Sequence, residues 1–229
     1  MIVEKKNQVG TFLPKIEESR DVPSINGSFS NVPSKIENYS KGEYIYLEGD
    51  ISSNLYRIKN GSVKIACASN SGTEVVKNIL GLESYFGEKS IAGENNRKEY
   101  AQAINPDTSV EVFHVNDLLV AAREDELLSI NLLKIVGRKL ESAERRLESI
   151  ISKDSRTRII EFLREMALDN GKKVGFETLI KNNFTHKDIA SLTGTSRQTV
   201  TTTLNSLKEQ NIINFDRRRI LIRDMEFLK

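Results

Sequence analysis

The most chemically distinctive residues of this sequence lie at the start of one predicted helix. In "TSRQTVTTTLNSL", residues 195–207, an arginine, a glutamine and several threonines surround or precede the apolar positions. The side chains expected on the exposed face are Arg197, Gln198, Thr201 and Thr202. Guanidinium, amide and hydroxyl groups donate and accept hydrogen bonds in defined directions. Such a helix end is suited to recognising a polar surface outside its own fold.

Two helices and a tight turn must hold these side chains in place. Thr185 and Asp188 have the spacing of a capping box at the start of a first helix, and Gly194 permits a turn after it. Ser196 is placed to cap the second helix. The apolar positions expected to face a shared core are Ile189, Leu192, Val200, Leu204 and Leu207. The pattern predicts a helix-turn-helix, whose second helix enters the DNA major groove in proteins that bind DNA.

Further polar residues lie where a DNA phosphate backbone would pass. Backbone amides and hydroxyls at helix starts commonly bind phosphates. The segment "IINFDRRRILIRD", residues 212–224, predicts a two-stranded wing with three arginines near its turn. The predicted phosphate contacts are Thr185, His186, Lys187, Ser196, Thr199, Arg217 and Arg218. Such contacts make the affinity for double-stranded DNA strongly salt-dependent.

The pattern of apolar and polar residues changes twice in the rest of the chain. Short β-branched and aromatic runs separated by glycine turns predict an antiparallel β domain, and Asn60-Gly61 between two of the runs predicts a hairpin. Three of the four prolines precede these runs, which predicts a loosely structured start. The predicted parts are a lead-in (1–38), a β domain (39–116), a long helix region (117–153) and the helix-turn-helix domain (154–229).

The long helix region carries a narrow apolar seam. Its apolar residues recur at alternating steps of three and four, as at the a and d positions of a coiled coil. The predicted interface residues are Leu133, Val136, Leu140, Ala143, Leu147 and Ile150. One interpretation is an amphipathic helix lying on its own β domain. The narrowness of the seam favours a matching helix, and therefore a parallel homodimer.

Composition limits the class of protein. The 229 residues are 38% hydrophobic, and no apolar run approaches the roughly 20 residues of a membrane-spanning helix. The start has no signal-peptide pattern, so we expect a cytoplasmic protein without a membrane partner. With one cysteine and two histidines, neither a disulfide nor a cysteine-rich metal site is expected, and no cofactor is predicted. Residues 153–229 carry 15 Lys and Arg against 10 Asp and Glu, which favours a polyanionic partner at that end.

Three stretches, in this order and spacing, carry a family resemblance. They are "YSKGEYIYLEGDISSNLYRIKNGSVKI", with glycines at 42, 49 and 61, then "YFGEKSIAG", and finally "TSRQTVTTTLNSLKEQNII". They resemble the β-roll, the effector loop and the recognition helix of the Crp/Fnr superfamily of bacterial transcription factors. The resemblance implies an α+β fold: an antiparallel β-roll of the cyclic-nucleotide-binding, double-stranded β-helix type, a long dimerisation helix and a C-terminal winged helix-turn-helix. It also implies a regulator that contacts RNA polymerase.

The resemblance gives roles to the residues of the recognition helix. Arg197 is expected to read guanine, a role that suits its two-pronged guanidinium. Where the family often has a glutamate that accepts from cytosine, this chain has Gln198, and the later arginine of the cyclic-AMP receptor falls at Thr202. Glutamine pairs best with adenine, and the threonine methyl contacts thymine. We therefore expect a palindromic operator whose half-sites differ from the receptor's TGTGA.

The effector pocket departs from the family pattern. In cyclic-AMP-binding members a Gly-Glu pair holds the ribose, an Arg-Ser pair neutralises the phosphate, and a Thr-Ser pair meets the adenine. Gly87 and Glu88 match the first pair, "NNRKEYAQA" contains no Arg followed by Ser, and the third pair falls at Ala143 and Glu144. The predicted pocket residues are Gly87, Glu88, Lys89, Ser90, Arg97, Lys98 and Glu144. Arg97 and Lys98 either attract another anion or are exposed loop charges.

Cyclic AMP is therefore not the expected effector, and a small molecule of unknown identity, or none, is left open. Two other functions are weighed against this one. The first is a cyclic-nucleotide-responsive regulator with an altered phosphate pocket. The second is a cupin-like β-roll enzyme, but cupins bring several histidines to one metal and the β region supplies only His114. We therefore expect a DNA-binding regulator and not an enzyme.

Overall fold

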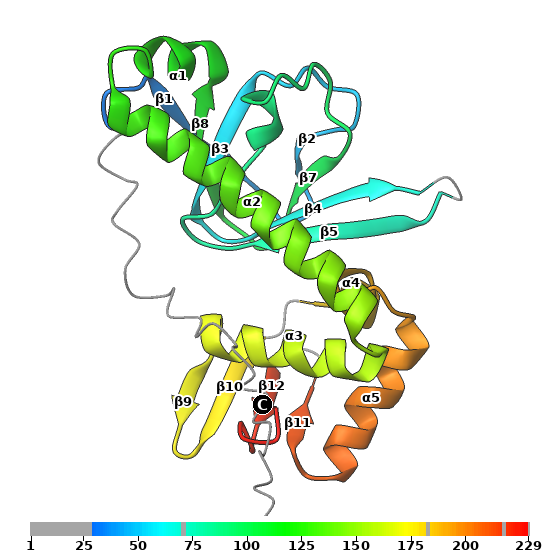
Figure 1. The fold of residues 1–229 in the computed structure, drawn as a ribbon. Helices are drawn as coiled ribbons and strands as arrows, with labels where there is room; N and C mark the ends of the chain where they lie inside the picture. Colours follow the sequence, from blue (N-terminus) through cyan, green and yellow to red (C-terminus); the bar gives the residue numbers. More distant parts are fainter. Residues whose placement is uncertain (1–28, 70–71, 182–183, 217–218, 229) are drawn as a thin grey trace, which may run out of the picture.

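The computed structural model describes residues 29–69, 72–181, 184–216 and 219–228 (Figure 1). The β domain contains β1 (Ser34–Tyr39), β2 (Tyr44–Tyr46), β3 (Asn54–Asn60), β4 (Val63–Ala68), β5 (Glu74–Leu80), β6 (Tyr85–Phe86), the short 3-10 helix η2 (Glu88–Ser90), β7 (Tyr100–Ala103) and β8 (Thr108–His114). The helices α1 (Val115–Ala121) and α2 (Glu126–Ser152) follow. The C-terminal domain contains α3 (Ser155–Asn170), β9 (Lys172–Val174), β10 (Glu177–Lys181), α4 (His186–Thr193), α5 (Arg197–Glu209), β11 (Ile213–Phe215) and β12 (Arg219–Ile222). The fold is therefore α+β, as the sequence predicts.

The β domain is built from two four-stranded antiparallel sheets. One sheet has the strand order β1-β8-β3-β6 and the other the order β2-β7-β4-β5. Buried side chains from both sheets form one apolar core, in which the Tyr56 ring stacks on the Phe86 ring with centroids 4.9 Å apart. The alternation of apolar and polar residues along the strands produces this arrangement, because one face of each sheet meets the core.

The Asn60-Gly61 hairpin that the sequence predicts is wrong. β3 pairs with β8 and β6, whereas β4 pairs with β5 and β7, so Asn60-Gly61 joins strands of different sheets. Gly61 has φ +82°, and a Cβ atom there would lie 2.6 Å from Thr108 Oγ1. The glycine is required by a corner that passes close to the start of β8. The chain crosses here because both sheets must cover the same core.

The β domain begins before the boundary expected from the sequence. β1 pairs with β8 from Ser34 to Tyr39, and all of it except Tyr39 lies within the segment predicted as a lead-in. Phe29 and Val32 are buried with Phe113 just before it. Most side chains of β1 are exposed, as suits a strand at a sheet edge. Its sequence therefore lacks the apolar alternation that identifies a strand.

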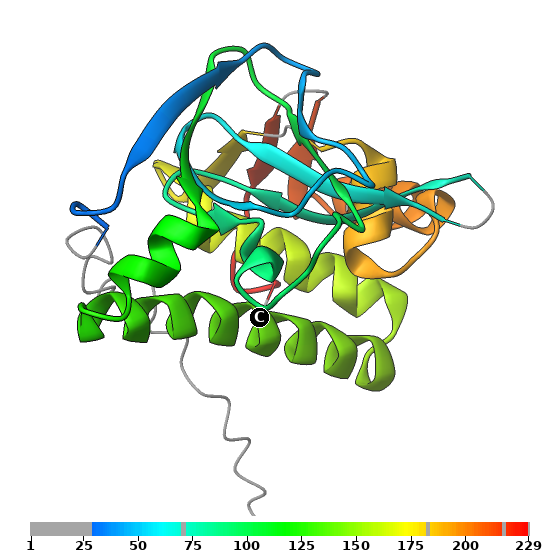
Figure 2. The same ribbon diagram turned by 90° about the horizontal axis from the view of Figure 1, so that it is seen from above.

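The long helix α2 connects the two domains. Its N-terminal half buries Leu128, Leu132 and Ile135 against α1 and the sheet that contains β8. Its C-terminal half passes beside β5 and reaches α4 (Figure 1). Seen from above, α2 runs along one side of the whole molecule (Figure 2). Asp125 caps its start, because the Asp125 side chain accepts a hydrogen bond from the Leu128 amide at 3.0 Å.

The C-terminal domain packs its helices against a small sheet. α3, α4 and α5 share an apolar core that includes Leu163, Ile189 and Leu204. The sheet has the order β11-β12-β10-β9, and the β11–β12 pair is the wing that the sequence predicts. The β9–β10 pair was not expected. All three residues of β9 are exposed, so no apolar alternation indicates a strand there.

Candidate functional site

The helix-turn-helix forms through the caps that the sequence predicts. Thr185 and Asp188 make a capping box: the Asp188 amide donates to Thr185 Oγ1 at 3.2 Å, and the Thr185 amide donates to Asp188 Oδ2 at 2.8 Å. Gly194 follows α4 with φ +61°, a left-handed conformation that glycine adopts without strain. Ser196 caps α5, and its hydroxyl accepts from the Thr199 amide at 3.0 Å. These local bonds fix the angle at which α5 leaves the turn.

The polar start of α5 is exposed. Ile189, Val200, Leu204 and Leu207 are buried, and Leu192 is half-buried. The opposite face presents the side chains of Arg197, Gln198 and Thr202 to solvent. These three predicted base-reading residues therefore lie together on the surface of one helix end.

Thr201 differs from the other predicted base-reading residues. Its hydroxyl donates to the Arg197 carbonyl at 3.0 Å and lies 2.9 Å from His186 Nδ1. Because the single hydroxyl proton is used on the carbonyl, Thr201 accepts the bond from the imidazole, which places a proton on Nδ1. Thr201 thus ties α5 to the start of α4, and its methyl group is the part left for contact with another molecule.

Among the predicted phosphate contacts at the helix starts, some side chains are exposed and some also make hydrogen bonds within the fold. Lys187 and Thr185 are exposed. The Thr185 hydroxyl bonds to Asp188, and the Ser196 hydroxyl lies 2.8 Å from Thr199 Oγ1, so both side chains also serve as caps. His186 is half-buried, and burial, followed by the charge of Arg197, lowers the pKa of its imidazole.

The wing carries the remaining predicted phosphate contacts. Arg217 and Arg218 lie outside the described residues. Arg219, the third arginine of the run, is largely exposed and pairs with Asp216 at 3.2 Å. Arg219 was not named among the predicted phosphate contacts, although it belongs to the same run of three arginines. In the described part of the wing, the exposed guanidinium of Arg219 is therefore paired with a carboxylate.

The predicted seam of α2 is exposed along its length. The relative exposures are 72% for Leu133, 61% for Leu140, 59% for Leu147 and 46% for Ile150. Ala143 is exposed as well, and Val136 is half-buried. A continuous apolar stripe on a surface helix is a common mark of a protein interface.

A hollow of about 550 Å³ lies between α2 and the strands β4, β5 and β6. Of the predicted pocket residues, Gly87, Glu88 and Lys89 line it. Ser90, Arg97, Lys98 and Glu144 are not among its lining residues. The polar groups that the sequence analysis missed are Lys77, Asn78, Glu99, Lys139, Ser142 and Arg146. We call this space the β5–α2 hollow.

Arg97 is neither an exposed loop charge nor a lining residue of the hollow. It is only 3% exposed. Its guanidinium donates to the carbonyls of Gly87 at 3.1 Å and Asn54 at 2.6 Å, and lies 4.4 Å from the centre of the Tyr46 ring. Arg97 therefore holds the backbone behind the hollow, because its donors are directed at carbonyls inside the β domain.

A buried carboxylate lies at the wall of the hollow. Glu99 is 7% exposed and accepts from Lys89 Nζ at 2.7 Å and Lys77 Nζ at 2.9 Å. Burial opposes its ionisation, but the two lysine bonds outweigh burial and hold the pKa of Glu99 below its usual value. The position of Glu99 in the sequence offers no signal of this cluster, since its partners come from β5 and η2.

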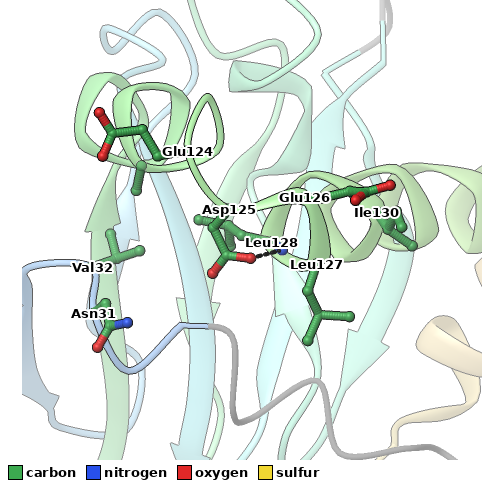
Figure 3. A pocket seen from close by; sticks show the side chains of 9 residues that line it. Asn31, Val32, Glu124, Asp125, Glu126, Leu127, Leu128 and Ile130 are labelled. Carbon is green, nitrogen blue, oxygen red and sulfur yellow. Dashed lines mark hydrogen bonds between the residues drawn. The ribbon is translucent and has the colours of Figure 1, made fainter.

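A second hollow, of about 840 Å³, lies where α1 turns into α2. Figure 3 shows its lining side chains, among them Asn31, Glu124, Asp125 and Leu127, drawn from that corner and the segment before β1. Asp125 is occupied in capping α2. In the described part of the chain, no three His, Cys, Asp or Glu side chains are grouped to hold a metal ion. No helix among the described residues combines the length and the apolar character needed to cross a bilayer.

Two protein-family descriptions match this chain. Residues 36–123 match the cyclic nucleotide-binding domain, and residues 157–229 match the Crp-like helix-turn-helix domain. The first match begins near β1 and ends in the turn between α1 and α2. The second begins in α3 and covers the caps, the recognition face and the wing described above.

Curated relatives and solved structures resemble the chain over most of its length. A cyclic AMP receptor protein of Thermus thermophilus is 27% identical, over 83% of this chain and 85% of that protein. A global nitrogen regulator of Nostoc is 25% identical, over 83% of this chain and 86% of that protein. The structure of FixK2 from Bradyrhizobium japonicum superposes with a TM-score of 0.75 at 24% identity, over 86% of this chain and 96% of that one. The last likeness concerns the fold.

Proposed function

This chain belongs to the Crp/Fnr family of DNA-binding transcription regulators, which are not enzymes, and we propose that two copies of it bind a palindromic operator through α5. The observation that supports the proposal is the exposed, arginine-led start of α5 on a capped helix-turn-helix. In this arrangement Arg197 reads guanine, Gln198 reads adenine, and Thr202 offers its methyl to thymine. Contact with RNA polymerase rests on the family resemblance, and the cytoplasmic location expected from the sequence stays a prediction.

The α2 seam supports the homodimer. Leu133, Leu140 and Leu147 expose apolar surface at the spacing of a coiled coil, and two such helices side by side cover one another's stripes. A twofold axis along this contact gives the two α5 helices the symmetry of a palindrome. Successive half-sites then lie about 34 Å apart, one turn of the double helix.

Lys187, Arg219 and the helix starts position the protein on the phosphate backbone. Charged contacts of this kind release counterions from DNA, so the affinity falls steeply as the salt concentration rises. The first turns of α4 and α5 add backbone amides to these contacts, while the hydroxyls of Thr185 and Ser196 hold the caps. These contacts set the register and leave base reading to the exposed end of α5.

Selection of binding sites from random duplex DNA tests the proposal directly. The expected result is a palindrome whose half-sites differ from TGTGA at the positions facing Gln198 and Thr202. Recovery of TGTGA as the best half-site would contradict the assigned base contacts. Failure to enrich any sequence would contradict DNA recognition by α5 itself.

The β5–α2 hollow is the proposed effector site, and its ligand is not a cyclic nucleotide. The Arg-Ser phosphate anchor of the cyclic-AMP-binding members has no counterpart in the sequence, and Arg97 directs its guanidinium at the carbonyls of Gly87 and Asn54. Lys77 and Lys89 already share the carboxylate of Glu99. A buried phosphate without its own partner is costly. Titration calorimetry with cyclic AMP and cyclic GMP is expected to show no binding, and micromolar affinity for either would restore the cyclic-nucleotide alternative.

A further inference from the structure

The carboxyl end of α4 is held by arginines from other helices. The last carbonyls of any helix lack partners inside the helix, so they need donors from elsewhere. At this end the Ala190 carbonyl accepts from the Gly194 and Thr195 amides. The next four carbonyls all accept hydrogen bonds from guanidinium groups. They belong to Ser191, Leu192, Thr193 and Gly194.

Arg158 provides the bonds that stay within the C-terminal domain. Its Nε donates to the Thr193 carbonyl at 2.7 Å and its Nη2 to the Gly194 carbonyl at 3.0 Å. Its Nη1 also donates to the Lys153 carbonyl at 2.6 Å. Arg158 lies on α3, whose apolar face shares one core with α4 and α5. It therefore fastens α4 to its own domain and to Lys153, the residue that follows α2.

Arg146 crosses the boundary between the domains. It lies on α2, and its Nη2 donates to the Leu192 carbonyl at 2.7 Å and the Ser191 carbonyl at 3.2 Å. Its Nη1 donates to the Lys77 carbonyl on β5 at 2.5 Å. One side chain thus joins β5 of the β domain, the long helix α2 and α4, the first helix of the helix-turn-helix. Figure 1 shows β5 and α4 beside the C-terminal part of α2.

The chemistry of arginine suits this junction. A guanidinium presents five donors in a rigid plane, so it can bond in two directions at once, whereas a lysine ammonium is a point charge on a flexible stem. The positive charge also faces the negative end of the α4 dipole. Among the described residues, Arg146 donates its hydrogen bonds to three backbone carbonyls. Burial lowers the pKa of its guanidinium, which nevertheless stays protonated at neutral pH.

We propose that Arg146 is the positioning residue that fixes the helix-turn-helix relative to α2 and β5, and so sets the separation of the two recognition helices in the dimer. The inference rests on the proposed operator binding. α2 carries the seam that pairs the two copies, so any rotation of the C-terminal domain about the end of α2 moves α5 relative to α5 of the second copy. Arg146 restrains this rotation, because its bonds reach both sides of the junction.

The same residue adjoins the effector site. Arg146 and Lys77 both line the β5–α2 hollow, and the Lys77 carbonyl is one of the three acceptors. A ligand in the hollow therefore lies against the junction. Such a ligand changes DNA binding if it binds more tightly to one arrangement of β5 and Arg146 than to another.

A series of operators with different spacing separates positioning from general damage. The half-site recovered by selection is placed in palindromes whose two half-sites are one base pair closer together or one base pair farther apart. Each change rotates one half-site by about 35° relative to the other. Wild-type protein is expected to lose at least about tenfold in affinity on either change. Arg146→Ala is expected to bind the best palindrome about 10- to 100-fold more weakly, as loss of charge-assisted hydrogen bonds predicts. It is also expected to lose less than about threefold on changing the spacing.

Arg145→Ala is the matched control. Arg145 is the neighbouring arginine on α2, but its side chain is 59% exposed and pairs with Glu141 at 3.3 Å. It is expected to keep both the affinity and the spacing preference of wild-type protein. Arg146→Lys keeps the charge without the planar fork, so it is expected to regain part of the affinity while its spacing profile stays flat. If Arg146→Ala does not fold, Arg146→Lys provides the comparison.

The outcomes distinguish this inference from the function on which it rests. Wild-type protein that binds no selected palindrome contradicts the proposed function. The positioning role alone is overturned if wild-type protein has a clear spacing preference and the Arg146 variants keep it. The variants compared are Arg146→Lys and, where it folds, Arg146→Ala. Weakened binding with an unchanged spacing preference also overturns it, because it shows loss of affinity without loss of placement.

Discussion

Placing a charge in the α2 seam tests whether the seam pairs two copies of the chain. In a coiled coil, Leu140 would occupy the middle of the stripe and meet its own counterpart across the twofold axis. It is 61% exposed in the single chain, so most of its apolar surface remains to be covered. Leu140→Lys removes that surface and places an ammonium group opposite a second ammonium group.

The size of the effect follows from this exposure. Full burial of a leucine side chain stabilises by about 1.5–3 kcal/mol, so the exposed part of Leu140 is worth about 1–2 kcal/mol. Two copies lose it together, which gives about 2–4 kcal/mol before any cost of burying charge. At about 1.4 kcal/mol per factor of ten, the dimer dissociation constant rises about 30- to 1,000-fold. The fold of each chain is expected to survive, because the residue is mostly exposed there.

Sedimentation velocity over a range of protein concentrations measures this change, and operator binding is followed in parallel. Glu148→Lys is the control, since Glu148 is exposed on α2 outside the seam and its replacement changes the charge by more than Leu140→Lys does. The control is expected to dimerise as wild-type protein does. An unchanged dissociation constant for Leu140→Lys would refute the assignment of the interface to this stripe.

Three further changes test other parts of the structure. Arg197→Ala is expected to weaken binding to the best operator by about 1–3 kcal/mol and to relax the preference at one base pair, which fluorescence anisotropy with substituted operators measures. Arg97→Met is expected to lower the free energy of unfolding by about 2–4 kcal/mol, because it removes two buried, charge-assisted hydrogen bonds to the carbonyls of Gly87 and Asn54. Lys98→Met, at an exposed neighbour, is expected to change it by less than about 0.5 kcal/mol in urea titrations. For His186, burial and Arg197 lower the folded-state pKa, so the unfolded chain takes up the proton first as the pH falls below about 6.5, and stability is lost from there down to the folded-state pKa. His186→Gln is expected to lack this part of the fall in thermal unfolding midpoints.

Each of these changes has an outcome that contradicts its reasoning. Equal loss of affinity on every operator would show that Arg197 contacts phosphate and not a base. Equal unfolding energies for Arg97→Met and Lys98→Met would show that the buried guanidinium contributes no net stability. Parallel pH profiles for wild-type protein and His186→Gln would show that the imidazole does not titrate differently in the two states.

The sequence by itself determined the helix-turn-helix and the order of the domains. The caps at Thr185 and Ser196, the turn at Gly194 and the stripe from Val200 to Leu207 depend on contacts between residues no more than four positions apart, or on a simple helical period. Such contacts survive any uncertainty about the rest of the fold. For this reason the recognition face follows directly from the residues that form it.

Only the tertiary structure decided which strands pair and what the buried charges do. Asn60-Gly61 has the composition of a hairpin, yet the strands beside it belong to different sheets, because both sheets must cover one core. Arg146 binds carbonyls that lie 45, 46 and 69 positions away along the chain. Nothing in the residues around Arg146 distinguishes it from Arg145. Its partners are backbone groups, which every residue possesses, so only the packing of β5 and α4 against α2 selects them.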